Sequence, residues 1–111
     1  MSKYHAKPTI VDGIRFASKA EARRYSELKM LEKAGEIERL DLQPKFPLVV
    51  SGLRVGTYIA DFRYYRVLNR NARTTITSQV VEDVKGVKTP VYRLKKKIVE
   101  ALYPVTITEV A

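Results

Sequence analysis

The sequence predicts an α/β protein in which a mixed β-sheet is flanked by helices. Three observations predict it: helical segments at residues 18–34 and 89–103, strand-like runs between them, and a short alternating run at 105–110. A strand, a helix and a further strand in succession imply a parallel pair of strands joined by a right-handed crossover. The expected core order is therefore helix, three strands, helix, strand (α-β-β-β-α-β), preceded by a small hairpin.

The N-terminal elements carry turn and capping signals. Residues 1–8 are basic and polar and are expected to form an arm. Asp12-Gly13 between two apolar triplets favours a type I′ turn, and hence the hairpin. Ser18 is a favourable N-cap, and Gly35 stands where a left-handed C-cap belongs. The apolar stripe of the first helix consists of Ala22, Tyr25, Leu28 and Leu31.

The strands and the second helix follow. Residues 36–50 are typical of one or two strands interrupted by proline, and residues 57–67 and 74–85 of two further strands. Thr89 and Pro90 supply the N-cap and first position of the second helix. Its buried face is expected to consist of Val91, Leu94, Ile98 and Leu102.

The composition limits the classes of function. A length of 111 residues suits one domain, which we expect over residues 1–111. The 21 Lys and Arg against 12 Asp and Glu give a net charge of +9, which favours a polyanionic partner, nucleic acid first. The absence of cysteine and the single histidine, His5, exclude disulfides and His-rich metal sites. No apolar run approaches the ~20 residues of a membrane span, so we expect a cytosolic protein.

Three charged residues stand in a strand that is otherwise apolar. Glu82, Asp83 and Lys85 follow two valines within the predicted strand 74–85. Buried charges are costly, and sequences accept that cost mainly at functional sites. Because side chains alternate along a strand, Asp83 and Lys85 share one face and Glu82 points to the other. A bulge would reverse these faces, so whether Glu82 or Asp83 accompanies the lysine stays open.

Two further acids occupy unusual positions. Asp61 interrupts an apolar and aromatic run, where it either pairs with a base such as Arg63 or has a functional role. Glu21 completes a capping box with Ser18, yet it also lies beside the inward stripe of the first helix. If the strands of Asp61 and Asp83 are neighbours, two carboxylates and a lysine converge. Such a group suits a divalent metal and a water directed at a phosphodiester.

This ordered set of residues resembles the PD-(D/E)xK nuclease superfamily. The superfamily pattern has a helix glutamate, a strand aspartate and Asp-x-Lys on the next strand, followed by a helix and a strand. In this chain the pattern covers roughly residues 18–110. The chain also resembles a small phage and prophage family of unknown function, similar to endonuclease-I-type Holliday-junction resolvases. The segments that carry this resemblance are Lys3-Tyr4-His5, Gly13-Ile14 with Phe16, Ser18-Lys19-Ala20-Glu21-Ala22, Tyr58-Ile59-Ala60-Asp61-Phe62 and Val81-Glu82-Asp83-Val84-Lys85-Gly86. One departure is Ala60, where the superfamily motif has proline.

The resemblance implies a metal-dependent DNA endonuclease, with branched DNA as one candidate substrate. Asp61 and Asp83 would hold Mg²⁺ or Mn²⁺, joined by the backbone carbonyl of Val84. Lys85 would orient or deprotonate the attacking water, or stabilise developing charge. Glu21 would be the helix glutamate found in a subset of these nucleases. It further implies a phage or prophage protein acting in the cytoplasm of a bacterial host, without a small-molecule cofactor.

Basic side chains are expected to follow the DNA backbone, since phosphate contacts strengthen binding without reading sequence. The candidates are Lys19, Arg23, Arg24, Arg70, Arg73, Arg93, Lys95, Lys96 and Lys97. The three consecutive lysines spread around a helix, so an ordinary solvated face is an equal alternative for them. A homodimer would suit symmetric cutting of two strands, although no interface is readable. The alternative function is a catalytically inactive DNA-binding accessory module on the same fold.

Overall fold

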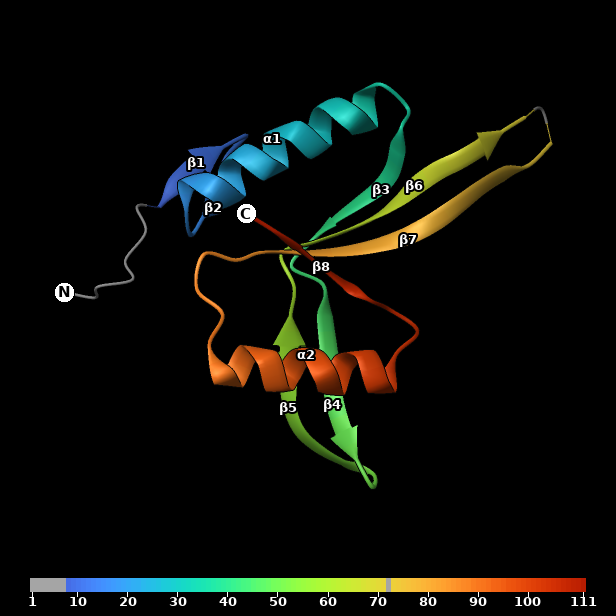
Figure 1. Ribbon diagram of the computed structural model, residues 1–111. Helices are drawn as coiled ribbons and strands as arrows, with labels where there is room; N and C mark the ends of the chain where they lie inside the picture. The colour runs from blue at the N-terminus through green and yellow to red at the C-terminus, as the bar shows by residue number, and fades with distance from the viewer. Residues whose placement is uncertain (1–7, 72) are drawn as a thin grey trace.

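The computed structural model describes residues 8–71 and 73–111, so nearly all of the predicted N-terminal arm lies outside the described residues. Figure 1 shows the arrangement of the elements. In chain order they are β1 (Thr9–Val11), β2 (Ile14–Phe16), α1 (Lys19–Lys33), β3 (Ile37–Leu42), β4 (Lys45–Val50), β5 (Leu53–Ile59), β6 (Phe62–Arg70), β7 (Thr75–Val84), α2 (Pro90–Leu102) and β8 (Ile107–Val110). In this part of the chain, neither helix has the length and apolar character needed to cross a membrane.

The central sheet confirms the predicted class, a mixed sheet flanked by helices. Its strand order is β3-β6-β7-β8. The β3–β6 and β6–β7 pairs are antiparallel, whereas β7 and β8 are parallel and joined through α2, as predicted. The order α1, β3, β6, β7, α2, β8 is the expected helix, three strands, helix, strand. The β4–β5 hairpin is inserted between β3 and β6 as a separate two-stranded sheet.

The predicted strand 57–67 is wrong in one respect, because the chain passes from one sheet to another within it. β5 pairs with β4, whereas β6 pairs with β3 and β7. Ala60 and Asp61 form the junction between them. The Ala60 N–H donates to the Pro44 carbonyl and the Asp61 N–H to the Glu82 carbonyl, both at 3.1 Å. Asp61 therefore stands at a bend beside the end of β7, and not within a strand.

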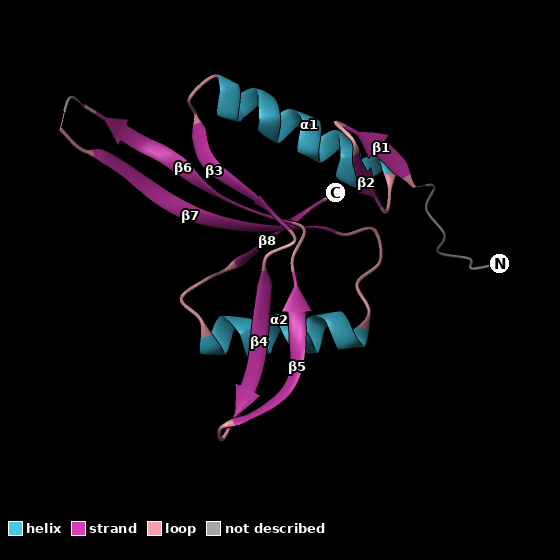
Figure 2. Ribbon diagram, turned by 180° about the vertical axis from the view of Figure 1, so that it is seen from behind, coloured by secondary structure: helices cyan, strands magenta, loops and turns pink. Residues whose placement is uncertain are grey.

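Two apolar cores lie on opposite sides of the central sheet, one towards α1 and one towards α2 (Figures 1 and 2). The core towards α1 contains Phe16, Ala22, Tyr25, Leu28, Ile37, Phe62 and Tyr64. The core towards α2 contains Phe46, Leu48, Tyr58, Ala60, Val81, Tyr92, Val99 and Ile107. β7 contributes to both, since Val80 packs against the first and Val81 belongs to the second. Side chains at the end of β7 consequently alternate between the two helices.

The N-terminal hairpin and α1 match their sequence signals. Asp12 and Gly13 have φ angles of +53° and +74°, as a type I′ turn requires. The Ser18 hydroxyl accepts a hydrogen bond from the Glu21 N–H at 3.1 Å, and Gly35 ends the helix with φ of +79°. The N-terminus of α1 is therefore fixed, and with it the position of Glu21 relative to the sheet.

The buried face predicted for α2 is wrong in three of its four residues, since only Ile98 is partly buried and packs against the core on that side. Val91, Leu94 and Leu102 are 62%, 59% and 45% exposed, whereas Tyr92 and Val99 are buried. The helix turns these two residues, seven positions apart, towards the β4–β5 hairpin. The Tyr92 ring lies 6.3 Å from that of Tyr58, in the range of favourable aromatic pairs. Because α2 carries apolar residues on two faces, only the packing partner decides which face is buried.

Candidate active site

The end of β7 keeps a regular register beside Asp61. Phe62 pairs with Glu82, and no register shift occurs between there and Val67. Asp61, the residue before β6, lies beside the end of β7, where its N–H donates to the Glu82 carbonyl. Asp61 Oδ2 accepts a 2.7 Å hydrogen bond from the Val84 N–H, which fixes the carboxylate against β7. The alternation of faces deduced from the sequence is therefore confirmed: Asp83 lies on the side of α2 and Glu82 on the side of α1.

Asp83 is a buried carboxylate with few partners. The residue is 0% exposed, and Lys85 Nζ lies 3.6 Å from its Oδ1, an ion pair longer than a hydrogen bond. Within the described residues neither carboxylate oxygen has a hydrogen-bond partner. Burial raises the pKa of Asp83 to about 6, although Lys85 opposes the shift. Buried polar atoms nearly always have hydrogen-bond partners, so these two oxygens have unused capacity for a water or another ligand.

Lys85 lies between a carboxylate and an aromatic ring. Its ammonium is 4.5 Å from the centroid of the Tyr92 ring, within cation–π range. The Tyr92 hydroxyl donates to Glu109 at 2.8 Å, and Glu109 pairs with Lys88 and Lys96 at 3.1 and 3.5 Å. The ring is thus anchored at its far end and limits where the Lys85 ammonium can move. No pattern in the sequence indicates this role for Tyr92.

Glu21 approaches the same region from α1. Burial and the negative charge of Asp61 raise the pKa of Glu21, with a smaller contribution from Asp83. A hydrogen bond from the Ala17 backbone and the positive charge of Lys85 lower it. The predicted catalytic residues therefore interact electrostatically across the end of the sheet. The Ser18 hydroxyl caps the Glu21 N–H, and the Glu21 side chain lines the same pocket as Asp61, so its two suggested roles stay predictions.

Asp61 and Glu21 line a small pocket of about 110 Å³ between the N-terminal hairpin and the β3–β4 connection. Burial raises the pKa of Asp61, while the Val84 N–H and Lys85 lower it. Gln43 lines the same pocket, and its N–H donates to the Asp61 carbonyl at 3.0 Å. Gln43 has a φ of +53°, uncommon for a residue other than glycine. The sequence marked Gln43-Pro44 only as a break in a strand, so Gln43 was missed as a residue of the site.

The donor set suits a hard divalent cation, although the ligands are not preassembled. Among the described residues, no group of three or more His, Cys, Asp or Glu side chains could hold a metal ion. Mg²⁺ is usually bound by one or two carboxylates, with waters and substrate phosphates completing its shell. Asp61 and Asp83 supply two carboxylates, and neither Asp83 oxygen has a hydrogen-bond partner within the described residues. The Val84 carbonyl lies on the same edge of β7 as its N–H, which faces Asp61.

Glu82 belongs to a different network. The Arg24 guanidinium donates to both of its carboxylate oxygens, at 2.8 and 2.6 Å, and the Tyr64 hydroxyl also donates to it. Glu82 is 1% exposed, so this pair lies between α1 and the sheet. Arg24 also contacts Glu27 at 3.2 Å. We therefore remove Arg24 from the candidate DNA contacts, because its guanidinium is committed to two carboxylates within the protein.

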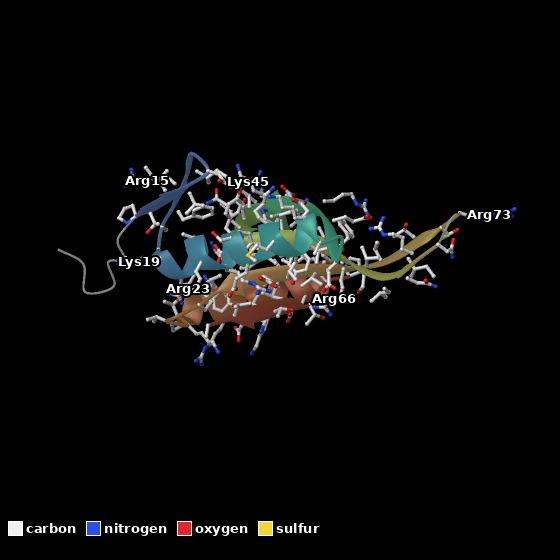
Figure 3. The ribbon with its side chains drawn as sticks, turned by 90° about the horizontal axis from the view of Figure 1, so that it is seen from above. Arg15, Lys19, Arg23, Lys45, Arg66 and Arg73 are labelled. Atoms are coloured by element: carbon white, nitrogen blue, oxygen red, sulfur yellow. The ribbon has the colours of Figure 1, made fainter. Side chains whose placement is uncertain are left out.

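The other candidate phosphate contacts are spread over the molecule. In Figure 3, Arg73 lies at the far end of the β6–β7 hairpin, and Lys19 lies near the opposite end with Arg15. Lys19, Arg23, Arg70, Arg73, Arg93 and Lys97 are exposed. Arg70 lies 3.6 Å from Glu38, Lys96 pairs with Glu109, and Lys95 donates to the Thr57 carbonyl at 3.3 Å. Exposed arginines absent from the candidate set include Arg15, which lines the pocket of Asp61, and Arg66.

Residues 1–110 match the family described as "Protein of unknown function (DUF1064)", and the chain belongs to this family. No curated protein and no solved structure matches the chain.

The raised pKa of Asp83 predicts that the wild type and the Asp83→Asn variant differ in stability by an amount that depends on pH. Between about pH 4 and pH 6 the folded protein binds this proton more tightly than the unfolded chain, so the free energy of unfolding falls as the pH rises. Asp83→Asn removes the titration. We expect the variant to be more stable than the wild type by about 2 kcal/mol at pH 7.5, and equal to it near pH 4. Urea denaturation at both pH values measures this difference.

Glu27→Gln serves as the control, because Glu27 is exposed and pairs only at the surface of α1. Its effect at pH 7.5 should stay below about 0.5 kcal/mol. An Asp83→Asn variant that is less stable than the wild type at pH 7.5 would show that the Lys85 pair outweighs the cost of burying the carboxylate.

Proposed function

We propose that this protein is a metal-dependent endonuclease that hydrolyses phosphodiester bonds in DNA. The observation that carries the proposal is Asp83, fully buried, whose oxygens have no hydrogen-bond partner in the described residues and whose ion pair with Lys85 is 3.6 Å long. A purely structural ion pair at this depth would be expected to satisfy its carboxylate, because an incompletely paired buried charge is destabilising. Asp61 on the adjacent bend supplies a second carboxylate.

The chemistry follows from the charges at the site. When bound, Mg²⁺ or Mn²⁺ would neutralise charge on the phosphoryl oxygens and lower the pKa of a bound water. Asp61, Asp83 and the Val84 carbonyl would hold the ion. Lys85, restrained by Asp83 and the Tyr92 ring, would donate a hydrogen bond to a phosphoryl oxygen or orient the attacking water. Glu21, whose pKa is raised mainly by burial, would take a proton from that water when its carboxylate is ionised.

The positive charge supports DNA as the substrate. The chain carries a net charge of +9, and exposed arginines and lysines occur on both helices and on the β6–β7 hairpin. The longest dimension of the molecule is 49 Å, long enough for several of these side chains to contact one DNA segment. The protein would therefore bind the backbone broadly and cut where the acids and Lys85 meet it. Branched DNA remains one candidate substrate.

Incubation with DNA tests the proposal directly. Supercoiled plasmid, linear duplex and a four-way junction are each incubated with Mg²⁺, with Mn²⁺ or with EDTA. We expect cleavage of at least one substrate with a divalent ion and none with EDTA, since the carboxylates need a cation to approach phosphate. Salt-sensitive binding without cleavage of any substrate would favour the inactive DNA-binding module instead. Neither binding nor cleavage would contradict both functions.

A further inference from the structure

A groove opens beside Lys85 on the α2 side of the sheet. It lies between the end of β5 and the first turn of α2 and has a volume of about 300 Å³. That size is at the lower end of small-ligand pockets, about 300–1,000 Å³. It is distinct from the smaller pocket of Asp61, Glu21 and Gln43, with which it shares no lining residue.

The charge lining this groove is positive. Lys85 and Lys95 both line it, and no acidic side chain does so among the described residues. Lys95 donates one hydrogen bond to the Thr57 carbonyl at 3.3 Å, which leaves two of its three N–H donors for a ligand. Two ammonium groups on one groove favour an anionic group between them, and phosphate is the anion that the adjacent site would process.

The walls of the groove are apolar and exposed. Ile59 and Val91, 51% and 62% exposed, line it from β5 and α2. Tyr58 lines it as well, is 3% exposed, and has a hydroxyl without a hydrogen-bond partner in the described part of the chain. Because that hydroxyl is itself buried, it is not accessible to a ligand in the groove. The groove thus combines a site for an anion with two apolar surfaces.

We propose that this groove binds a single nucleotide of the DNA, the one next to the phosphate that is cut. Its phosphate lies between Lys85 and Lys95, and its base rests on Ile59 and Val91. A base can reach such a groove only when it leaves the duplex stack. The groove therefore favours DNA with an unpaired nucleotide at the cleavage position. The placement of this nucleotide next to the cleaved phosphate rests on the proposed nuclease function. Nucleotide binding by the groove does not depend on that function.

Titration of the ¹⁵N-labelled protein with thymidine 5′-monophosphate in EDTA tests the groove. We expect amide signals around Thr57–Ile59 and Thr89–Tyr92 to shift, with tighter binding than for thymidine or inorganic phosphate alone. Lys95→Gln should weaken nucleotide binding about threefold to tenfold. Lys33→Gln, on α1 and outside the groove, should leave it unchanged.

Three results would overturn the nucleotide site. These are no shifts in the two segments up to about 20 mM nucleotide, inorganic phosphate binding as tightly as the nucleotide, or equal losses for Lys95→Gln and Lys33→Gln. The titration contains neither a divalent ion nor polymeric DNA, so its outcome is independent of cleavage. The two proposals can therefore fail independently. The protein can cleave DNA without binding the nucleotide in this groove, or bind the nucleotide without cleaving DNA.

Discussion

Asp83→Asn and Lys85→Ala are each expected to lower the rate of metal-dependent DNA cleavage by at least about 10³-fold. Asp83→Asn removes the charge of a carboxylate whose oxygens have no hydrogen-bond partner in the described residues and are therefore open to a metal ion. Lys85→Ala removes the ammonium that lies between Asp83 and the Tyr92 ring. Initial rates of cleavage with Mg²⁺ measure both losses, on the substrate that the wild type cuts best.

DNA binding should separate these variants from simple misfolding. In EDTA, Asp83→Asn should bind DNA as well as the wild type or slightly better, because one negative charge near the phosphates is lost. Asp41→Asn and Lys33→Ala are the matched controls, since Asp41 pairs with Arg63 on the partly exposed surface and Lys33 lies at the end of α1. Both controls should cleave at wild-type rates. If Asp83→Asn and Lys85→Ala also cleave at wild-type rates, the site is misassigned.

The same substitution is expected to move stability and activity in opposite directions. Asp83→Asn should stabilise the fold above pH 6, because burial raises the pKa of the carboxyl to about 6, and it should abolish cleavage. A residue kept only for structure would not show this combination. Active sites commonly retain groups that reduce stability, and a gain in stability with a loss of activity is their signature.

The faces of β7 could be predicted because a strand has a period of two, so Asp83 and Lys85 had to lie together. The environments of the two acids, Glu82 and Asp83, could not be predicted from the sequence. Glu82 and Asp83 are equally buried, yet one is paired by Arg24 and the other has no hydrogen-bond partner in the described chain. Arg24 and Glu82 are 58 positions apart, and only the packing of α1 on the sheet brings them into contact. No local pattern in the sequence contains that information.

The junction at Ala60 and Asp61 was hidden for a similar reason. Residues 57–67 are uniformly strand-like, and β5 differs from β6 only in the partners with which it pairs. The bend places Asp61 beside Val84, which makes the aspartate part of the site without burying it in a strand. Tyr92 contributes a ring against the Lys85 ammonium, and Gln43 contributes a left-handed backbone beside Asp61. Both contributions arise from tertiary contacts, so the sequence did not indicate them.

Arg24→Ala is expected to lower the free energy of unfolding by about 3–5 kcal/mol, the usual cost of breaking a buried ion pair by removing one partner. The loss arises because Glu82, 1% exposed, would keep its charge with only the Tyr64 hydroxyl of its present side-chain donors. Arg23→Ala is the matched control, since Arg23 is the exposed neighbour on the same helix, and its effect should stay below about 0.5 kcal/mol. Urea denaturation at pH 7.5 measures both.

A double substitution distinguishes a buried pair from a general packing defect. Arg24→Met with Glu82→Leu replaces both charges by apolar groups of similar volume, and it should recover most of the stability that Arg24→Ala loses. A double variant as unstable as Arg24→Ala would assign the loss to packing of α1 and not to an unpaired charge. Unchanged stability of Arg24→Ala, with weaker DNA binding, would return Arg24 to the DNA-contacting surface. The expected result instead makes Arg24 and Glu82 the contact that holds α1, and with it Glu21, against the sheet that carries Asp61 and Asp83.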